Sequence, residues 1–410
     1  MYNVKKILLI VGLILITILI GLAIYFFIFK GKTGFFPGTT TPSPTTSVQT
    51  LPGSGIRTVV TTTGTVVSSD TLPSSGIVQQ DVPSSYYQPK TVSQLTSDYS
   101  TYTSVNNNDG QMRYYNGLDG KFYKIATDGS IKALSDKPFY NASKITWAKT
   151  KDKAVIEYPD NSKIIYNFEA SKQVSLPKHW EDFSFSPEGS EIAAKSIGIS
   201  PDNRWLVTMR DDGTGIKTVE SMGNNAKYVS VDWSPSRQVV AFSETGRPIG
   251  SERQEIYLVG LNKENFKSLT VEGRGFESKW SNTGKKLIYS VYSSRSEYKP
   301  ELWIVDSYGD TINTNRQLLN LNTWPEKCTF GNENTIYCAV PQNLPEGAGM
   351  SKAIADNTAD NLYKIDLSSG LRSPIQLDKN YTVDAISFDS KNNKLFFTDK
   401  KQTGIFEVKL

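Results

Sequence analysis

Histidine and cysteine are almost absent from this 410-residue chain, which has one histidine and two cysteines. Zinc and haem sites are built largely from these side chains, so we expect no metal site and no cofactor, with carboxylate-bound calcium as the one alternative. A strong basic excess is also lacking, because residues 90–410 carry 40 basic and 39 acidic residues. Nucleic-acid binding needs a basic surface that neutralises phosphates, so the composition predicts no nucleic-acid partner.

The G-x-S-x-G motif of α/β-hydrolases is missing as well. The sole histidine, His179 in LPKHWEDF, is expected in a surface connection and not as a general base, which would need an ordered nucleophile nearby. The sequence therefore gives no positive sign of an enzyme, and we expect none.

One long apolar run stands at the start of the chain, from Ile7 to Phe29. As a helix it would span roughly 34 Å, enough to cross a hydrocarbon core of about 30 Å. The run is too long for the core of a cleaved signal peptide and leads into Lys30-Gly31-Lys32. We expect residues 1–30 to form a short cytoplasmic tail and a single transmembrane helix that contacts the lipid bilayer through residues 7–29.

The next segment, residues 31–89, is dominated by Thr, Ser, Pro, Gly and Val, as in TTTPSPTTS at Thr39–Ser47. With few large apolar residues it cannot bury enough surface to offset the loss of chain entropy, so we expect a disordered stalk. The protein is thus predicted at the cell membrane, crossing it once, with its N-terminus in the cytoplasm and its bulk outside.

After Lys90 one pattern recurs: an aromatic residue, a short turn and a run of β-branched or aromatic residues. The aromatic anchors are Trp147, Phe185, Trp233, Trp280, Phe330 and Phe388, with a degenerate copy from Ser104. Their spacing of 38–58 residues indicates a solenoid or propeller.

Each repeat accommodates four strands, a to d. The anchor ends strand a, a turn leads to strand b, as in KLIYS, and strand c alternates large residues, as in ELWIVDS. Four strands in about 45 residues make a propeller blade. The fold class is therefore all-β, and residues 90–410 are predicted as a seven-bladed β-propeller, with six or eight blades as alternatives.

The last repeat ends at strand c, in GIFEVKL, whereas KTVSQLT at Lys90–Thr96 resembles a strand d. We therefore expect residues 90–97 to pair beside 404–410 and close the ring, which leaves no open sheet edge.

The pattern (W/F)-S-P-x-G-x-x-(I/L)-(A/V)-(Y/F), as in WSPSRQVVAFS and FSPEGSEIAAKS, resembles the propeller repeats of the TolB type and of dipeptidyl-peptidase-like domains. The resemblance covers roughly residues 90–410 and implies the propeller architecture. It implies no particular activity, because this fold hosts unrelated functions.

The two cysteines, Cys328 and Cys338, flank one a–b turn in CTFGNENTIYC. With a three-residue loop they lie opposite each other and project from the same sheet face. They would then form a disulfide, in keeping with an oxidising compartment, or remain as two buried thiols.

Three successive b–c connections are long: residues 244–254, 291–300 and 341–360. All b–c loops leave the same face of a propeller, so these insertions should form one rim. They contain residue types that suit interfaces, and the predicted binding residues are Arg247, Arg253, Arg295, Tyr298 and Met350.

We therefore expect a binding module for a protein or a cell-envelope polymer. One alternative is a lyase or glycan hydrolase with carboxylates at the mouth of the central channel. The other is a structural subunit of a surface assembly.

Overall fold

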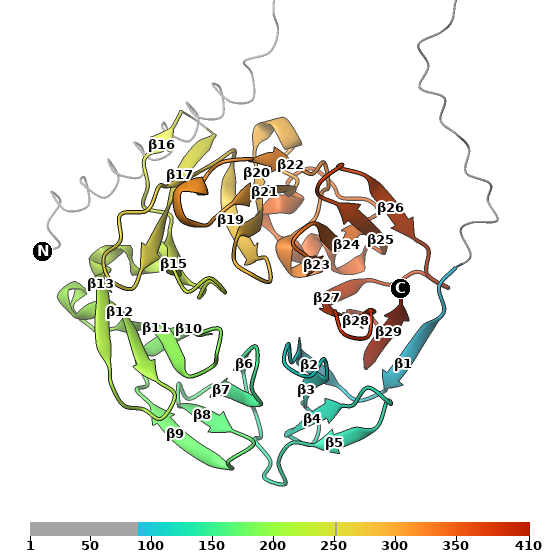
Figure 1. The fold of residues 1–410 in the computed structure, drawn as a ribbon, viewed down its shortest axis with the longest axis horizontal. Helices are drawn as coiled ribbons and strands as arrows, with labels where there is room; N and C mark the ends of the chain where they lie inside the picture. Colours follow the sequence, from blue (N-terminus) through green and yellow to red (C-terminus); the bar gives the residue numbers. More distant parts are fainter. Residues whose placement is uncertain (1–88, 251) are drawn as a thin grey trace, which may run out of the picture. The chain divides into compact units, whose positions relative to one another are not determined.

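The computed structural model describes residues 89–250 and 252–410, which form a closed ring of seven antiparallel sheets (Figure 1). The all-β, seven-bladed β-propeller is confirmed, and the alternatives of six or eight blades are excluded. Within the described residues no helix has the length and apolarity needed to cross a membrane. The predicted span at residues 7–29 and the predicted stalk up to residue 88 lie outside them.

Blade 1 contains β2 (Ser100–Val105), β3 (Met112–Asn116), β4 (Lys121–Ile125) and β5 (Ile131–Ala133). Blade 2 contains β6 (Lys144–Trp147), β7 (Lys153–Glu157), β8 (Lys163–Asn167) and β9 (Lys172–Leu176). Blade 3 contains β10 (Trp180–Phe185), β11 (Glu191–Ile197), β12 (Arg204–Arg210) and β13 (Lys217–Ser221). Blade 4 contains β14 (Val229–Val231), β15 (Val239–Ser243), β16 (Pro248–Ile249), β17 (Arg253–Gly260) and β18 (Leu269–Val271).

Blade 5 contains β19 (Arg274–Trp280), β20 (Lys286–Tyr292), β21 (Glu301–Asp306) and β22 (Gln317–Leu318). Blade 6 contains β23 (Cys328–Asn332), β24 (Thr335–Pro341), β25 (Asp360–Asp366) and β26 (Arg372–Ile375). Blade 7 contains β27 (Val383–Asp389), β28 (Lys394–Asp399), β29 (Ile405–Lys409) and β1 (Val92–Thr96). Short 3₁₀ helices lie in the connections: η2 (Pro201–Asn203), η3 (Gly223–Tyr228), η4 (Ser294–Ser296), η5 (Gly309–Thr311), η6 (Pro325–Lys327), η7 (Ala348–Met350) and η8 (Lys352–Asn357).

The apolar core is divided among the junctions between blades. Seven clusters of buried side chains each draw on two neighbouring blades. Strand β7 shows the cause: Ala154 and Ile156 pack toward blade 1, whereas Val155 between them packs toward blade 3. Successive side chains of a strand point to opposite faces, and both faces are covered here. Strand b therefore reads as a continuous apolar run in most repeats.

The ring closes as the sequence predicts. Strand β1 pairs antiparallel with β29, with Val92 opposite Val408 and Thr96 opposite Ile405, so the start and end of the propeller share blade 7 (Figure 1). Gly404 directly precedes β29 and has a φ of +106°. A Cβ atom at this position would lie 1.9 Å from the Thr96 carbonyl oxygen. Only glycine allows this close approach.

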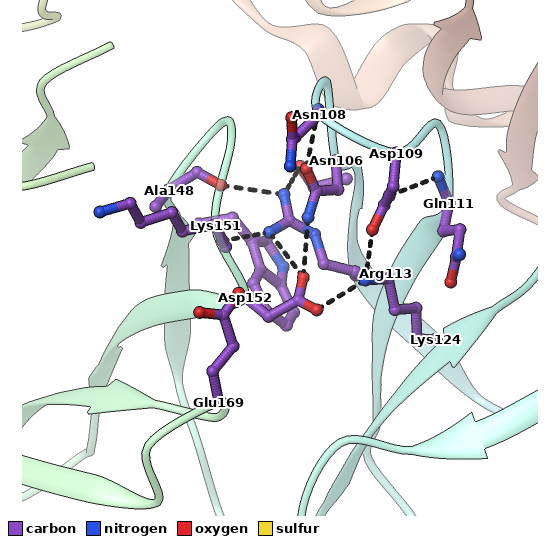
Figure 2. A network of polar contacts seen from close by, with 12 residues as sticks. Asn106, Asn108, Asp109, Gln111, Arg113, Lys124, Ala148, Lys151, Asp152 and Glu169 are labelled. Carbon is purple, nitrogen blue, oxygen red and sulfur yellow. Dashed lines mark hydrogen bonds and ion pairs between the residues drawn. The ribbon is translucent and has the colours of Figure 1, made fainter. Parts of the chain in front are cut away.

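A buried polar network joins blades 1 and 2 (Figure 2). The guanidinium of Arg113, fully buried, donates to the carbonyl oxygens of Ala148 (2.9 Å) and Lys151 (2.6 Å). Asp152 accepts from Lys124 at 2.6 Å and lies 3.5 Å from Arg113. Burial lowers the pKa of Arg113 to about 10, so it remains charged at neutral pH. Blade 1, whose repeat is the most degenerate, is thus tied to its neighbour by charge as well as by apolar packing.

Candidate functional site on the b–c face

The three long b–c loops, which we call the rim (residues 244–254, 291–300 and 341–360), contact one another. The amide of Gly347 donates to the Glu297 carbonyl oxygen at 2.9 Å, and that of Gly349 donates to the Tyr298 carbonyl oxygen at 2.7 Å. On the other side, the amide of Ser294 donates to the Glu252 carboxylate at 3.1 Å. The loops of blades 4, 5 and 6 are therefore one connected surface.

Local sequence explains how the loops fit together. A Cβ atom at Gly349 would lie 2.6 Å from the Cβ atom of Tyr292 and 2.7 Å from the Tyr298 carbonyl oxygen, so this contact requires glycine. Glu297 and Tyr298 both have φ +54°, a left-handed conformation that turns the chain sharply after η4.

Among the predicted binding residues, Arg247 and Met350 are exposed on the rim. Met350 is 59% exposed and lies four residues before Ile354, which is 41% exposed. Tyr298 is half-buried and contributes its carbonyl group to the contact between loops. The rim thus presents exposed apolar side chains on the loop of blade 6 and an exposed arginine on the loop of blade 4.

The other two predicted residues are engaged within the protein. Arg253 lies 3.8 Å from Glu272, which also binds Arg316 at 2.9 Å. Arg295 binds Glu301 at 3.0 Å, and Glu301 raises the pKa of Arg295. Both arginines remain half-exposed, so they can face a partner only with a carboxylate beside them.

A cavity of about 590 Å³ adjoins the rim, where strands of blades 6, 7 and 1 approach the central channel. Its lining includes Tyr102, Trp324, Lys352, Asp356, Asp384 and Lys400. Residues at the start of strands a and the end of a strand b meet here, which places the cavity on the b–c face. We call it the mouth cavity.

Two lysines at the mouth cavity each form ion pairs with two carboxylates. Lys352 lies 2.5 Å from Glu277 and 2.8 Å from Glu326, and Lys400 lies 3.1 Å from Asp356 and 2.8 Å from Asp384. Burial alone would lower the pKa of Lys352, but its two carboxylate partners outweigh burial and raise it.

The mouth is therefore a surface of mixed charge, lined by three carboxylates and three lysines. Within the described residues, no group of three or more His, Cys, Asp or Glu side chains is arranged to hold a metal ion.

Lys327, which helps to line the mouth cavity, forms a buried ion pair that fixes the end of the longest loop. Lys327 lies 2.9 Å and 3.0 Å from the two carboxylate oxygens of Asp360, and Asp360 also accepts from the amide of Val383 at 2.7 Å. Burial raises the pKa of Asp360 even though Lys327 opposes the shift. This pair links η6, β25 and β27.

At the opposite end of the central channel, where the a–b turns meet, all seven blades line a second cavity of about 620 Å³. We call it the turn-end cavity. Lys149, Asp232 and Lys279 are among its lining residues. Burial raises the pKa of Asp232 to about 6 and lowers that of Lys279 to about 8.

Sequence reasoning missed these charged residues, although a signal existed. Asp232 directly precedes the anchor Trp233, and Lys279 directly precedes the anchor Trp280. Strand a is the innermost strand of each blade, so the residue that precedes an anchor at its end lies beside the central channel.

The remaining sequence candidates are resolved simply. His179 is exposed between β9 and β10, as expected for a surface connection. Cys328 stands opposite Cys338, Phe330 stands opposite Ile336, and the two sulfurs are bonded with Cα atoms 4.1 Å apart.

The chain matches no protein-family model, and no curated protein matches it significantly in sequence. Among solved structures it is similar to an oligogalacturonate lyase in complex with manganese, with a TM-score of 0.54 and 11% identity over 78% of this chain and 93% of that chain. It is also similar to the β-propeller domain of Cps50 (Swd1) from Myceliophteria thermophila, with a TM-score of 0.51 and 12% identity over 78% and 99% of the two chains. The likeness is one of fold.

Proposed function

We propose that residues 90–410 are the binding module of a single-pass membrane protein and that the rim engages a protein or polymer of the cell envelope. The observation that carries the proposal is the joining of three long loops from successive blades into one surface with exposed Met350 and Ile354. Loops held on a rigid scaffold are where proteins place binding residues, and Met is enriched at interfaces.

The location outside the cytoplasm is part of the same proposal. The apolar run at residues 7–29 supports a membrane anchor, and the Thr/Ser/Pro-rich residues 31–89 support a stalk. The Cys328–Cys338 bond agrees with an oxidising compartment. The repeat pattern supports kinship with TolB-type propellers.

An enzyme with carboxylates at the channel mouth is the second candidate, because Glu277, Glu326, Asp356 and Asp384 gather there. Each of these carboxylates has a lysine partner, whereas a general base needs a carboxylate free to accept a proton. Binding therefore fits the mouth better than catalysis does, and we propose that the protein is not an enzyme.

Blade 6 offers a matched pair of positions to test the rim. Met350 is 59% exposed on the b–c face, and Leu371 is 64% exposed in the c–d turn on the opposite face. A photoreactive residue placed at Met350 of the full-length protein in intact cells should cross-link one recurrent partner that is absent at Leu371.

Substitution gives the quantitative arm of the same test. Met350→Glu should weaken binding of that partner by about tenfold or more, as truncation of an interface hot spot does, and Leu371→Glu should not. Identical cross-links from both positions, or equal effects of both substitutions, would contradict a binding role for the rim.

A further inference from the structure

The turn-end cavity holds charges that no ion pair among the described residues neutralises. Its charged lining residues are Lys149, Asp232, Lys279, Asp389 and Lys391. Asp389 accepts from the side chain of Asn392 and the amide of Lys391, while the ammonium of Lys391 donates to the Asn108 carbonyl oxygen. Asp389 and Lys391 belong to the same a–b turn of blade 7, and together they add no net charge to the cavity. Lys149, Asp232 and Lys279 remain.

These three side chains influence one another without touching. All three line the same cavity, and, after burial, the charge of Lys149 is the next influence on the pKa of Asp232 and of Lys279, lowering both. Within residues 89–250 and 252–410 no ion pair joins any two of them. The ammonium of Lys279 donates only to a neutral group, the Cys328 carbonyl oxygen, at 2.5 Å.

An enclosed charge without a partner is costly, and proteins normally pair or neutralise it. Two lysines against one aspartate leave an excess positive charge in the cavity. Neutral donors surround it, among them Asn107, Ser278 and Asn282. Lysine and short hydroxyl or amide donors together are the groups that bind carboxylate, sulfate and phosphate oxygens.

We propose that the turn-end cavity is a binding site for an oxyanion, held between Lys149 and Lys279. The site lies at the opposite end of the channel from the rim and does not depend on the function proposed there. The oxyanion is either free in solution or an acidic group on a polymer.

Asp232 makes the site sensitive to pH. The charged groups that face it are Lys149 and Lys279, which favour its ionised form, and Asp182, which opposes it. Because its pKa is about 6, Asp232 is neutral in more acidic solution, and only the two lysines then face the anion. Burial and the charge of Lys149 lower the pKa of Lys279 to about 8, although Glu326 and Asp232 oppose the shift, so Lys279 loses its proton above about pH 8. Anion affinity should therefore fall as pH rises, in one step near 6 and another near 8.

Sulfate is a suitable probe because its charge does not change in this range. Isothermal titration of the full-length protein with sulfate should show binding that Lys149→Met weakens by about tenfold, the effect of losing one charged hydrogen bond. Lys149 makes no side-chain bond within the described residues, so its loss should leave folding intact. Asp232→Asn should tighten binding at pH 7 and abolish the step near pH 6.

The matched control is Lys285→Met, an exposed lysine in the a–b turn of blade 5. Equal losses in Lys285→Met and Lys149→Met would mean diffuse attraction to surface lysines and would overturn the proposal. Sulfate binding that is unchanged in Lys149→Met would also overturn it. So would an unmodified protein that binds neither sulfate nor a short oligouronate.

Comparison of the two probes separates the sources. Tighter binding of the oligouronate than of sulfate, lost in Lys149→Met, assigns the site to an acidic polymer. The reverse order, with the same loss, assigns it to a free anion.

Discussion

At the scale of single residues, the pair Lys327 and Asp360 has the least access to water of the ion pairs in the described residues, with side-chain exposures of 5% and 1%. Removing one partner of a buried pair leaves the other charge without compensation, which typically costs about 3–5 kcal/mol. Lys327→Met should therefore lower the free energy of unfolding by roughly that amount in urea denaturation. The loss should shrink as pH falls, because protonated Asp360 needs no counter-charge.

An exposed pair provides the comparison. Lys178 lies 3.5 Å from Asp160, and their side chains are 67% and 64% exposed. Such pairs contribute about 0–1 kcal/mol, so Lys178→Met should leave the urea midpoint nearly unchanged. A Lys327→Met variant as stable as Lys178→Met would show that the pair does not hold the end of the rim.

At the scale of elements, the hairpin of β23 and β24 is cross-linked through Cys328 and Cys338, ten residues apart. Closing a loop of this length in the unfolded chain stabilises a fold by about 2–3 kcal/mol in the chain-entropy model. Reductant should therefore lower the melting temperature by several degrees, as measured by circular dichroism. It should not affect a C328A/C338A variant, and an equal shift in both proteins would point to another cause.

Elements were the most predictable part of the molecule. Strand b of each repeat is recognisable because both of its faces are buried, and the anchors Phe185 and Trp280 mark where strand a ends. The register of Cys328 against Cys338 follows from the short turn between them. Charged residues follow no period, so the partners of Arg253 and Arg295, Glu272 and Glu301, could not be inferred.

At the scale of the whole molecule, β1 supplies the outer strand of blade 7. A chain that begins at residue 97 loses the β1–β29 hydrogen bonds and the packing of Val92 and Leu95. We expect a loss of roughly 4–6 kcal/mol and association through the exposed edge of β29. Size-exclusion chromatography and urea denaturation would measure both effects.

A chain that begins at residue 89 is the control and should behave as a stable monomer. Adding a peptide of residues 89–97 should restore the shorter chain. Equal stability of the two truncated chains would show that the ring does not depend on β1.

The ring arrangement also explains which features could be predicted from the sequence and which could not. Closure between residues 90–97 and 404–410 was predictable, because the last repeat lacks one strand and the first segment supplies it. Lys149, Asp232 and Lys279, in contrast, come from blades 2, 4 and 5 and line one cavity only because the blades surround one channel. Their proximity depends on the curvature of the ring, which no local pattern encodes.

Closure by β1 also imposes an order in time on the growing chain. Thr96 pairs with Ile405, so the first strand of the propeller to leave the ribosome waits for the last. At about 5–20 residues per second, that delay is on the order of 15–60 s. Throughout this interval blade 7 is incomplete, and the unpaired edges of its strands can pair wrongly with other segments or other chains. Blade 7 can be completed only after β29, residues Ile405–Lys409, has been synthesised.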